Sequence, residues 1–466
     1  MMKTTSLSAV VSRRTFVLGT AAASGAFFIP TTRLFGQDLP KKQLRLAVVG
    51  SGGIGVMTRK ELVKAGATVA ALCDVNASVL AKQAAEFPGI PTYTDWRKLF
   101  AHAKDFDAVA VCTPDHTHAI IALHAMRLGK HVYVQKPLAH SFEECAMLMK
   151  EQDRSGVVAQ MGNQHLPHTL KTRAALAANV IGPVKEVWCW TDRPAGWWPQ
   201  GMTAYPPAQP LPSCYTEEAW DLWNGPAPFH AYNAALAPFK WRGWWDYGTG
   251  AIGDMAIHNA GPAFLELGWG LPTAVQAFPD AAATVAFPEK VRIELEFAAT
   301  AQNPRPVKFV WLNAKQQPPA LPGMRPNYDY GGNGLLFIGE KGAFNGNPLG
   351  GLPALVAYGD HAWNDESKEA ARALQQALKA VPPHNENYHY RQFVDACLAN
   401  NPAGCTSRMR FAAPFTQSLL LGAIALRWPE RKLAFSAADG KFVNAPEADA
   451  FLKAPERGTF SMKEFA

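Results

Sequence analysis

A short apolar run followed at once by glycines constrains the fold of this chain more than any other feature. Leu44–Val49 reads Leu-Arg-Leu-Ala-Val-Val, and Gly50-Ser51-Gly52-Gly53-Ile54-Gly55 follows without a break. Such a run is typical of a strand buried on both faces of a parallel sheet. The glycines fit G-x-G-x-x-G, and the residues up to Ala65 suit a helix whose free N-terminal amides face an anion. The segment predicts a strand, a phosphate-binding turn and a helix.

An acidic residue supports this interpretation. A second apolar run, residues 68–73, ends in Asp74, 19 residues after Gly55. An acid at this place accepts hydrogen bonds from the hydroxyls of an adenine ribose and repels a 2′-phosphate. The glycines would also fit a plain tight turn, and Asp74 a solvated strand end. Strand, helix and acid together favour a dinucleotide site, so we predict NAD as the cofactor, with NADP as the alternative.

Apolar runs and amphipathic patterns continue to alternate further along the chain. We expect strands at residues 108–112 and 131–134, and helices at residues 77–87, 95–101, 116–128 and 141–155. This alternation is typical of parallel strands joined by helical crossovers. β-Branched and aromatic runs predict further strands at residues 273–297 and 307–313, with helices at 369–380, 388–398 and 411–426. An apolar face on that second sheet also suits a homo-oligomer interface.

Three stretches of this chain, taken in order, resemble the Gfo/Idh/MocA family, which includes glucose-fructose oxidoreductase and inositol dehydrogenase. They are the glycine turn, Thr113-Pro114-Asp115-His116-Thr117-His118 with Gln135-Lys136-Pro137 after it, and Gly253-Asp254-Met255-Ala256-Ile257-His258. The resemblance implies an α/β fold class: an N-terminal Rossmann domain with a doubly wound parallel sheet at residues 43–163. A C-terminal α+β domain with an open, mostly antiparallel sheet would follow at residues 164–466.

The resemblance also implies which residues form the site. The catalytic residues would be Lys136, Asp254 and His258. The cofactor would bind the glycine turn from Gly50 to Gly55 and, beyond it, Asp74, Thr113, Pro114, His116 and Lys136. A cis peptide bond between Lys136 and Pro137 is expected as well.

The chemistry suits these residue types. Oxidation of an alcohol by hydride transfer needs a base for the hydroxyl proton and a group that stabilises the developing oxyanion. We predict His258 as the base and Lys136 as the polarising group. Asp254 and His258 are four residues apart, so on a helix the carboxylate would orient the imidazole. The structural alternatives are a helix N-cap for Asp254, a hydrogen-bonded core position for His258 and a surface position for Lys136.

The chain departs from the family pattern at two positions. Gln135 stands where glutamate is usual, and Gly261 stands where many relatives have aspartate. A neutral Gln135 would not favour the charged form of Lys136, so we expect that lysine to titrate lower than in relatives.

Histidine pairs at residues 116 and 118 and at residues 165 and 168 resemble metal-ligand spacing. No carboxylate run accompanies them, and we predict no metal site. His116 is instead expected at a strand end beside the cofactor.

Tryptophan placement points to a carbohydrate. Nine of the 14 tryptophans fall within residues 188–245: Trp188, Trp190, Trp197, Trp198, Trp220, Trp223, Trp241, Trp244 and Trp245. Aromatic faces stack against the apolar face of a sugar ring, and the indole N–H donates to a hydroxyl. Several of these side chains must simply pack the core or an interface. The group as a whole favours a polyol substrate over a small acid.

The N-terminal segment, residues 1–36, predicts export. It contains Ser12-Arg13-Arg14-Thr15-Phe16, followed by an apolar stretch over residues 17–30. This pattern predicts a signal read by the twin-arginine export machinery and a periplasmic or otherwise exported protein. A membrane anchor and an ordinary first helix are the alternatives.

Charge and cysteine content exclude several other classes. Lys3, Arg13, Arg14 and Arg33 supply four of the seven net positive charges, and no basic stripe for nucleic acid remains in the rest of the chain. The seven cysteines show no CxxC spacing, so buried thiols are expected rather than a disulfide framework.

The sequence therefore predicts an exported oxidoreductase. It would transfer a hydride between a tightly bound nicotinamide cofactor and a hydroxyl or keto group of a sugar, glycoside or cyclitol. One alternative is an NAD-dependent glycoside hydrolase that uses transient oxidation and elimination. A second is a non-catalytic sugar-binding protein, because Gln135 and Gly261 replace expected acids.

Overall fold

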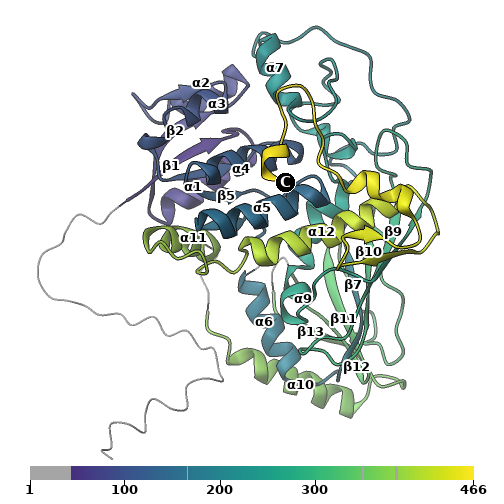
Figure 1. Cartoon of the computed structure of the whole chain (residues 1–466). Helices are drawn as coiled ribbons and strands as arrows, with labels where there is room; N and C mark the ends of the chain where they lie inside the picture. The colour runs from purple at the N-terminus through teal and green to yellow at the C-terminus, as the bar shows by residue number, and fades with distance from the viewer. Residues whose placement is uncertain (1–42, 165, 349–350, 384–386) are drawn as a thin grey trace, which may run out of the picture. The chain divides into compact units, whose positions relative to one another are not determined.

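The computed structural model describes residues 43–466, apart from residue 165, residues 349–350 and residues 384–386. This part of the chain contains two β-sheets with helices packed against them (Figure 1). The predicted twin-arginine segment lies outside the described residues, so the export signal stays a prediction. None of the helices in the described part is both long and apolar enough to span a bilayer.

The first sheet has six parallel strands in the order β3-β2-β1-β4-β5-β6. The strands are β1 (Leu44–Val49), β2 (Ala67–Cys73), β3 (Thr92–Tyr93), β4 (Ala108–Val111), β5 (His131–Val134) and β6 (Ala159–Met161). Every residue of β4 is buried, as expected for a central strand covered on both faces. The strand order reverses between β1 and β4, and a crevice forms outside the carboxyl ends of the strands at such a point.

Helices join these strands as predicted. They are α1 (Ile54–Lys64), α2 (Ala77–Ala84), α3 (Trp96–Phe100), α4 (His118–Arg127) and α5 (Phe142–Ser155). Local capping fixes their starts: Asn76 and Asp95 cap α2 and α3, and Ser141 forms a capping box with Glu144 at α5. Helix α4 begins two residues later than predicted, because Asp115–Thr117 forms a 3₁₀ turn.

The second sheet has nine strands in the order β13-β12-β11-β7-β10-β9-β8-β14-β15. They are β7 (Val184–Trp190), β8 (Ala274–Pro279), β9 (Val291–Phe297), β10 (Val307–Leu312), β11 (Gly334–Gly339), β12 (Gly342–Asn345), β13 (Ala354–Tyr358), β14 (Leu433–Ser436) and β15 (Lys441–Phe442). Strands β7 and β10 pair in parallel, and the other neighbours pair antiparallel. The predicted fold class, a parallel α/β sheet followed by an α+β part with a mostly antiparallel sheet, is confirmed.

The rest of the chain forms seven further α-helices in the described residues. They are α6 (Leu166–Ala177), α7 (Glu217–Asn224), α8 (Ile257–Asn259), α9 (Gly261–Glu266), α10 (Asp365–Lys379), α11 (Tyr388–Leu398) and α12 (Met409–Ala425). Helix α12 packs against α5 and β6 of the first sheet and against β8 and β9 of the second (Figure 1). Helix α11 returns to the first sheet, where Tyr390 and Phe393 share an apolar core with Leu46 and Leu72.

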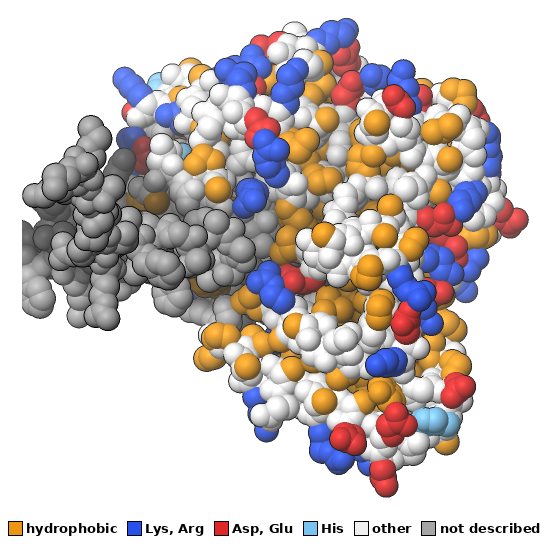
Figure 2. Space-filling model, turned by 60° about the horizontal axis from the view of Figure 1, so that its bottom comes forward, with side chains coloured by type: hydrophobic (Ala, Val, Ile, Leu, Met, Phe, Trp, Pro, Cys, Tyr) orange, Lys and Arg blue, Asp and Glu red, His pale blue; other side chains and the backbone are white. Residues whose placement is uncertain are grey.

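The outer face of the second sheet is partly apolar and partly charged. Val310 and Leu336 pack with Tyr328 from a loop of the same chain. On β9, Arg292 and Glu294 form an ion pair of 3.0 Å. Figure 2 shows basic and acidic side chains mixed over one face of the molecule. The chain itself thus covers the apolar part of this sheet face, and the homo-oligomer stays a prediction.

Candidate active site

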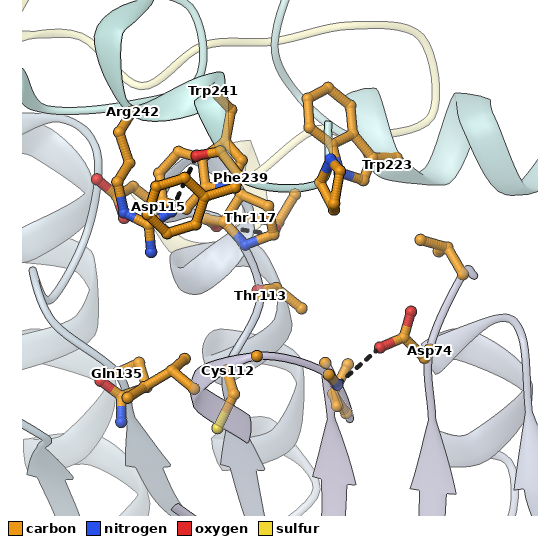
Figure 3. A pocket seen from close by; sticks show the side chains of 18 of the residues that line it. Asp74, Cys112, Thr113, Asp115, Thr117, Gln135, Trp223, Phe239, Trp241 and Arg242 are labelled. Carbon is orange, nitrogen blue, oxygen red and sulfur yellow. Dashed lines mark hydrogen bonds between the residues drawn. The ribbon is translucent and has the colours of Figure 1, made fainter. Parts of the chain in front are cut away.

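The glycine turn lies between β1 and α1, at the carboxyl edge of the first sheet (Figure 3). Gly50 has a φ of 84°, and its amide donates to the carbonyl oxygen of Cys73 at 2.9 Å. A Cβ on Gly50 would lie 2.6 Å from the backbone of Cys112, and one on Gly55 would lie 1.9 Å from the carbonyl oxygen of Gly50. Side chains are excluded at both positions because backbone atoms occupy the space.

Asp74 directly follows β2 and faces the glycine turn (Figure 3). Its Oδ2 accepts hydrogen bonds from the amides of Ser51 at 2.8 Å and Gly52 at 3.2 Å, and its Oδ1 accepts one from the amide of Asn76 at 2.9 Å. Burial raises the pKa of Asp74, and the three amide donors oppose that rise. A carboxylate at this position would accept hydrogen bonds from ribose hydroxyls and repel a 2′-phosphate, and this role of Asp74 stays a prediction.

A cavity of about 660 Å³ extends from the glycine turn to Lys136, Asp254 and His258. Eight predicted cofactor residues line it: Gly50, Gly52, Gly53, Ile54, Asp74, Thr113, Pro114 and Lys136. The Thr113 hydroxyl is buried without a hydrogen-bond partner in the described part of the chain, and a bound cofactor could supply one. A glycine-lined turn, an acid for the ribose and this hydroxyl fit NAD.

His116, predicted beside the cofactor, is not among the residues that line this cavity. Its Nε2 lies 2.7 Å from the carbonyl oxygen of Trp223, and its Nδ1 lies 3.2 Å from that of Tyr247. Burial lowers the pKa of His116 to about 3. The 3₁₀ turn directs the ring away from the strand end and into the aromatic cluster. His116 therefore holds Trp223, which does line the cavity.

His118 ties two of the motif segments together. Its Nδ1 lies 2.8 Å from the carbonyl oxygen of Pro137, and its Nε2 lies 2.8 Å from that of Thr113. The predicted cis peptide bond between Lys136 and Pro137 is present. These contacts fix the segment that carries Lys136 against the end of β4.

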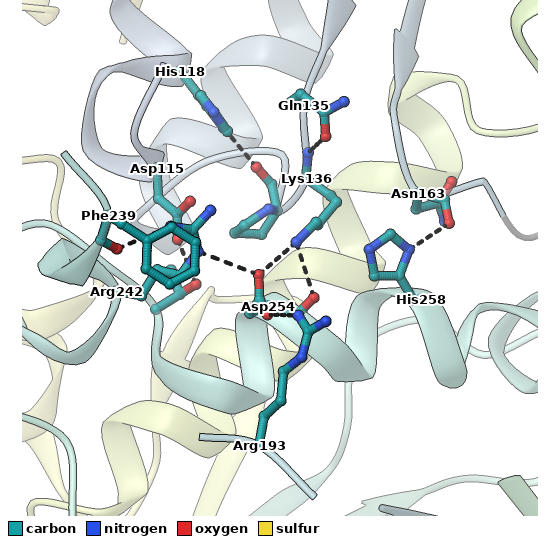
Figure 4. A network of polar contacts seen from close by, with 12 residues as sticks. Asp115, His118, Gln135, Lys136, Asn163, Arg193, Phe239, Arg242, Asp254 and His258 are labelled. Atoms are coloured by element: carbon teal, nitrogen blue, oxygen red, sulfur yellow. Dashed lines mark hydrogen bonds and ion pairs between the residues drawn. The ribbon is translucent and has the colours of Figure 1, made fainter. Parts of the chain in front are cut away.

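Lys136 and Asp254 form the centre of a buried charge network (Figure 4). The Nζ of Lys136 lies 2.6 Å from Oδ1 of Asp254 and donates to the carbonyl oxygen of the same residue at 3.2 Å. Arg193 donates to Oδ2 at 2.8 Å, and the Nε of Arg242 lies 3.7 Å from Oδ1. Burial alone would raise the pKa of Asp254. The three cations, of which Lys136 has the largest effect, hold this pKa well below its usual range. Asp254 is an ionised carboxylate.

The predicted pairing of Asp254 with His258 is absent from the described residues. The prediction assumed an α-helix, but Ile252–Ala256 forms a π-helix before α8 begins at Ile257. The wider turn rotates the two side chains off a common face. Asp254 lies inside that turn, so it is not the N-cap of a helix either. The carboxylate of Asp254 contacts Lys136, Arg193 and Arg242 instead. His258 contacts the backbone of Asn163.

A backbone carbonyl group determines which ring nitrogen of His258 carries the proton. Its Nδ1 lies 3.0 Å from the carbonyl oxygen of Asn163. Because a carbonyl oxygen only accepts, Nδ1 carries the proton and Nε2 carries the lone pair. Burial and the nearby Lys136 lower the pKa of His258 to about 4. The ring lines the cavity as a neutral imidazole at neutral pH.

Asp115 is a second buried carboxylate on the cavity wall. Its Oδ2 accepts a hydrogen bond from the Thr249 hydroxyl at 2.7 Å. Burial raises its pKa to about 6, against the effects of that hydrogen bond and of Arg242 and Lys136. Asp115 therefore adds a second negative charge near the same cations at neutral pH.

The structure shows the surroundings of the two positions that depart from the family pattern. Gln135 donates to the Thr58 hydroxyl at 2.7 Å, and its Oε1 accepts from the amide of Lys136 at 3.3 Å. The counter-charge for the Lys136 ammonium comes from Asp254. Gly261 is the first residue of α9 and is buried there. Neither position removes a group from the Lys136–Asp254 pair.

Three of the nine clustered tryptophans line the cavity: Trp197, Trp223 and Trp241. The guanidinium of Arg193 lies 3.8 Å from the ring centroid of Trp197, and that of Arg242 lies 4.3 Å from that of Trp241. Trp190, Trp220 and Trp244 are buried in apolar clusters. The prediction that some tryptophans serve the site and others the core agrees with this arrangement.

Sequence reasoning missed Arg193, Arg242 and Asn163. Arg193 precedes a proline in a loop, Arg242 lies in a short 3₁₀ helix, and no spacing rule marks either residue. Arg242 does follow Trp241 directly, which is a weak local signal. Asn163 acts through its backbone carbonyl, which no side-chain pattern reveals. Within the described residues, no group of three or more histidine, cysteine, aspartate or glutamate side chains is arranged to hold a metal ion.

Comparison with family models agrees with the fold. Residues 44–163 match the model for an oxidoreductase family with an NAD-binding Rossmann fold, and residues 198–302 match the model for the C-terminal alpha/beta domain of that family. Both models describe Gfo/Idh/MocA oxidoreductases. These two segments of the chain belong to that family, as the sequence motifs predicted.

Individual relatives match over shorter stretches. Inositol 2-dehydrogenase of Klebsiella pneumoniae is 38% identical over 117 residues, which is 24% of this chain and 34% of the relative. An alpha-N-acetylgalactosaminidase of Bacteroides fragilis is 32% identical over 158 residues, 32% of this chain and 37% of the relative. The chain thus spans about a third of the length of these curated relatives.

A solved structure shares the fold over most of the chain. An inositol dehydrogenase homologue from Azotobacter vinelandii, in complex with NADH and myo-inositol, superposes with a TM-score of 0.54 at 16% identity. The match covers 84% of this chain and 98% of that protein. At this level of identity the likeness concerns the fold alone.

Proposed function

We propose that this protein is an NAD-dependent oxidoreductase that acts on a hydroxyl or keto group of a sugar, glycoside or cyclitol. One observation carries the proposal: a single cavity joins the glycine turn and Asp74 to Lys136, Asp254 and His258. Relatives named as inositol 2-dehydrogenases and the aromatic side chains on the cavity wall support a polyol substrate. The family match to an NAD-binding fold supports the cofactor.

The residues divide the reaction between them. When bound, NAD supplies the hydride acceptor for the carbon that carries the hydroxyl. His258 takes the hydroxyl proton on Nε2, because Nδ1 is occupied by the bond to Asn163. The Lys136 ammonium, held by Asp254, stabilises negative charge on the substrate oxygen. Asp254 thus positions Lys136 rather than His258.

We further propose that the protein acts outside the cytoplasm with a tightly held cofactor. The paired arginines before an apolar stretch, Arg13 and Arg14, support export by the twin-arginine route. Proteins exported in this way cross the membrane folded, so the cofactor can be loaded beforehand. A second substrate would then return the cofactor to its starting redox state.

The test is to purify the protein from the periplasm, denature it, and identify any released nicotinamide. A parallel sample is first incubated with a panel of sugars and cyclitols. Stoichiometric NAD that becomes reduced by one of them supports the proposal. A protein that holds no nicotinamide and binds neither added NAD nor NADP contradicts it and favours a sugar-binding protein.

A glycoside hydrolase is the second candidate. The similarity to an alpha-N-acetylgalactosaminidase favours it. Transient oxidation of a ring hydroxyl acidifies the neighbouring C–H bond and permits elimination of the glycosidic substituent. Incubation with aryl glycosides separates the two candidates: release of the phenol with no net change in cofactor redox state identifies the hydrolase, whereas net reduction identifies the oxidoreductase.

A further inference from the structure

The charges at the substrate end of the cavity do not balance. Lys136, Arg193 and Arg242 line this end with three positive charges, and Asp254 and Asp115 contribute two negative ones. His258 is neutral there at neutral pH. This end of the cavity therefore has one more cation than carboxylate, and the third carboxylate of the cavity wall, Asp74, lies at the glycine turn. The phosphates of a dinucleotide belong at the glycine turn, at the opposite end, and would not neutralise it.

The accessible part of this network is its cationic part. The Asp254 side chain is 8% exposed, whereas those of Arg193 and Arg242 are 24% and 18% exposed. A molecule entering the cavity therefore meets guanidinium groups before it meets the carboxylate. Buried cations without a full set of counter-charges lose hydration, and a bound anion replaces it.

The two guanidinium groups are also held in fixed orientations. Arg193 stacks on Trp197 at 3.8 Å, and Arg242 lies 4.4 Å from the ring centroid of Phe239 and 4.3 Å from that of Trp241. Stacking occupies their faces and leaves their edges, which carry the N–H donors, for hydrogen bonding. Arg193 donates one N–H to Asp254, and Arg242 donates one to the carbonyl oxygen of Phe239 while its Nε faces Asp254 at 3.7 Å. Each guanidinium has five N–H donors, so others remain on both edges.

We infer that the substrate carries a carboxylate group that binds between Arg193 and Arg242, and that the protein acts on a sugar acid such as a uronate or an aldonate. A planar carboxylate matches the fork of an arginine edge. A single negative charge matches the single unbalanced positive charge, whereas a phosphate dianion would exceed it. The surrounding Trp197, Phe239 and Trp241 rings supply the apolar surface for a sugar ring. This inference rests on the proposed function.

Calorimetric titration of the full protein with saturating NAD tests the inference without relying on turnover. D-Glucuronate is compared with D-glucuronamide, which has the same shape without the charge. D-Galacturonate, D-mannuronate, D-gluconate and D-glucose 6-phosphate complete the panel. We expect at least one sugar acid to bind about 10- to 100-fold more tightly than its neutral counterpart, as hydrogen bonds to charged groups imply. Added salt should reduce this preference.

Arginine variants test which residues cause the preference for the acid. Arg193→Met and Arg242→Met should each remove most of the preference for the acid. Arg292→Met is the matched control, because Arg292 also stacks on an aromatic ring, Phe278, and pairs with a carboxylate, but lies outside the cavity. Thermal melting checks the folding of each variant. If the methionine variants do not fold, Arg193→Lys and Arg242→Lys keep the charge and remove the fork, and they should weaken acid binding by a smaller factor.

The outcomes separate this inference from the proposed function. Selective, arginine-dependent acid binding supports the inference even if no sugar reduces NAD. Three outcomes overturn the inference, even if a neutral sugar reduces NAD. They are equal binding of the sugar acid and its amide, a preference for the acid that persists in the arginine variants, and no binding of any sugar acid. Tighter binding of D-glucose 6-phosphate than of every carboxylate also overturns the carboxylate assignment.

Discussion

Nδ1 of His258 donates a hydrogen bond to the backbone carbonyl oxygen of Asn163 across 3.0 Å. This contact fixes the tautomer of the imidazole without a charged partner. The family pattern led us to expect Asp254 in that role, and Asp254 instead holds Lys136. The base and the polarising group are thus set by separate contacts, and variants at each should have separable effects.

The titration of His258 is the first expected outcome. Burial and Lys136 lower its pKa from the usual 6.5 to about 4, so the neutral form is present above that pH and is lost as pH falls through it. We expect no titration of this ring between about pH 5 and 8 in the NMR spectrum of protein with ¹³C-labelled histidine. His258→Gln assigns the signal. In Lys136→Met the pKa should rise, and a wild-type pKa near 6.5 would contradict the electrostatic account.

Lys136→Met should reduce kcat by about 100- to 1000-fold, because the substrate oxyanion loses its ammonium donor. The Kd for NAD should change by a much smaller factor than kcat, since the glycine turn and Asp74 are untouched. Steady-state kinetics and NAD titration measure the two effects. Lys64→Met is the control, as Lys64 is 67% exposed on α1 and pairs with Glu61 alone among the described carboxylates. An unchanged kcat would exclude Lys136 from the chemistry.

Asp74→Asn should weaken NAD binding by about 10-fold and narrow the preference for NAD over NADP. The amide keeps the shape of the side chain but removes the charge that accepts the ribose hydrogen bonds and repels a 2′-phosphate. Titration of both cofactors against wild type and variant provides the measurement. If the ratio of the two Kd values stays the same, the ribose role of Asp74 is refuted.

His116→Ala should lower the free energy of unfolding by about 1–3 kcal/mol, since the neutral ring donates a hydrogen bond to one of two buried carbonyl oxygens, those of Trp223 and Tyr247, and the variant removes it. Direct cofactor contacts should be unaffected, because the ring does not line the cavity. Urea unfolding and NAD titration of the same sample distinguish these effects. A variant of full stability that fails to bind NAD would restore the sequence-based assignment.

Local patterns predicted four of the six strands of the first sheet. The apolar runs at Leu44–Val49 and His131–Val134 are strands in which every residue but Arg45 and His131 is buried, and the glycine turn is recognisable because backbone atoms exclude any side chain. Strands β3, β6, β7 and β11 to β15 were not predicted. Several of these are only two or three residues long, and β7 and β11 pair with each other although they lie far apart in the sequence.

The sequence predicted several of the residues that form the candidate site, but it did not predict which of them contact one another. Lys136, Asp254 and His258 do meet at one cavity. Their pairing was not foreseen, because a π-helix changes which side chains share a face. Arg193 and Arg242 reach Asp254 from a loop and a short 3₁₀ helix, and only the tertiary fold brings those segments to the cavity.

The C-terminal segment, residues 457–466, contacts helices that are synthesised much earlier. The guanidinium of Arg127 on α4 lies 4.1 Å from the ring centroid of Phe465, and Lys150 on α5 donates to the carbonyl oxygen of Ala466 at 2.8 Å. Arg457 donates to the carbonyl oxygen of Gly225, just after α7, at 2.9 Å. The first sheet and its helices leave the ribosome some 300 residues before these contacts can form. A chain cut short before residue 457 would therefore lack these contacts with α4, α5 and the residue that follows α7.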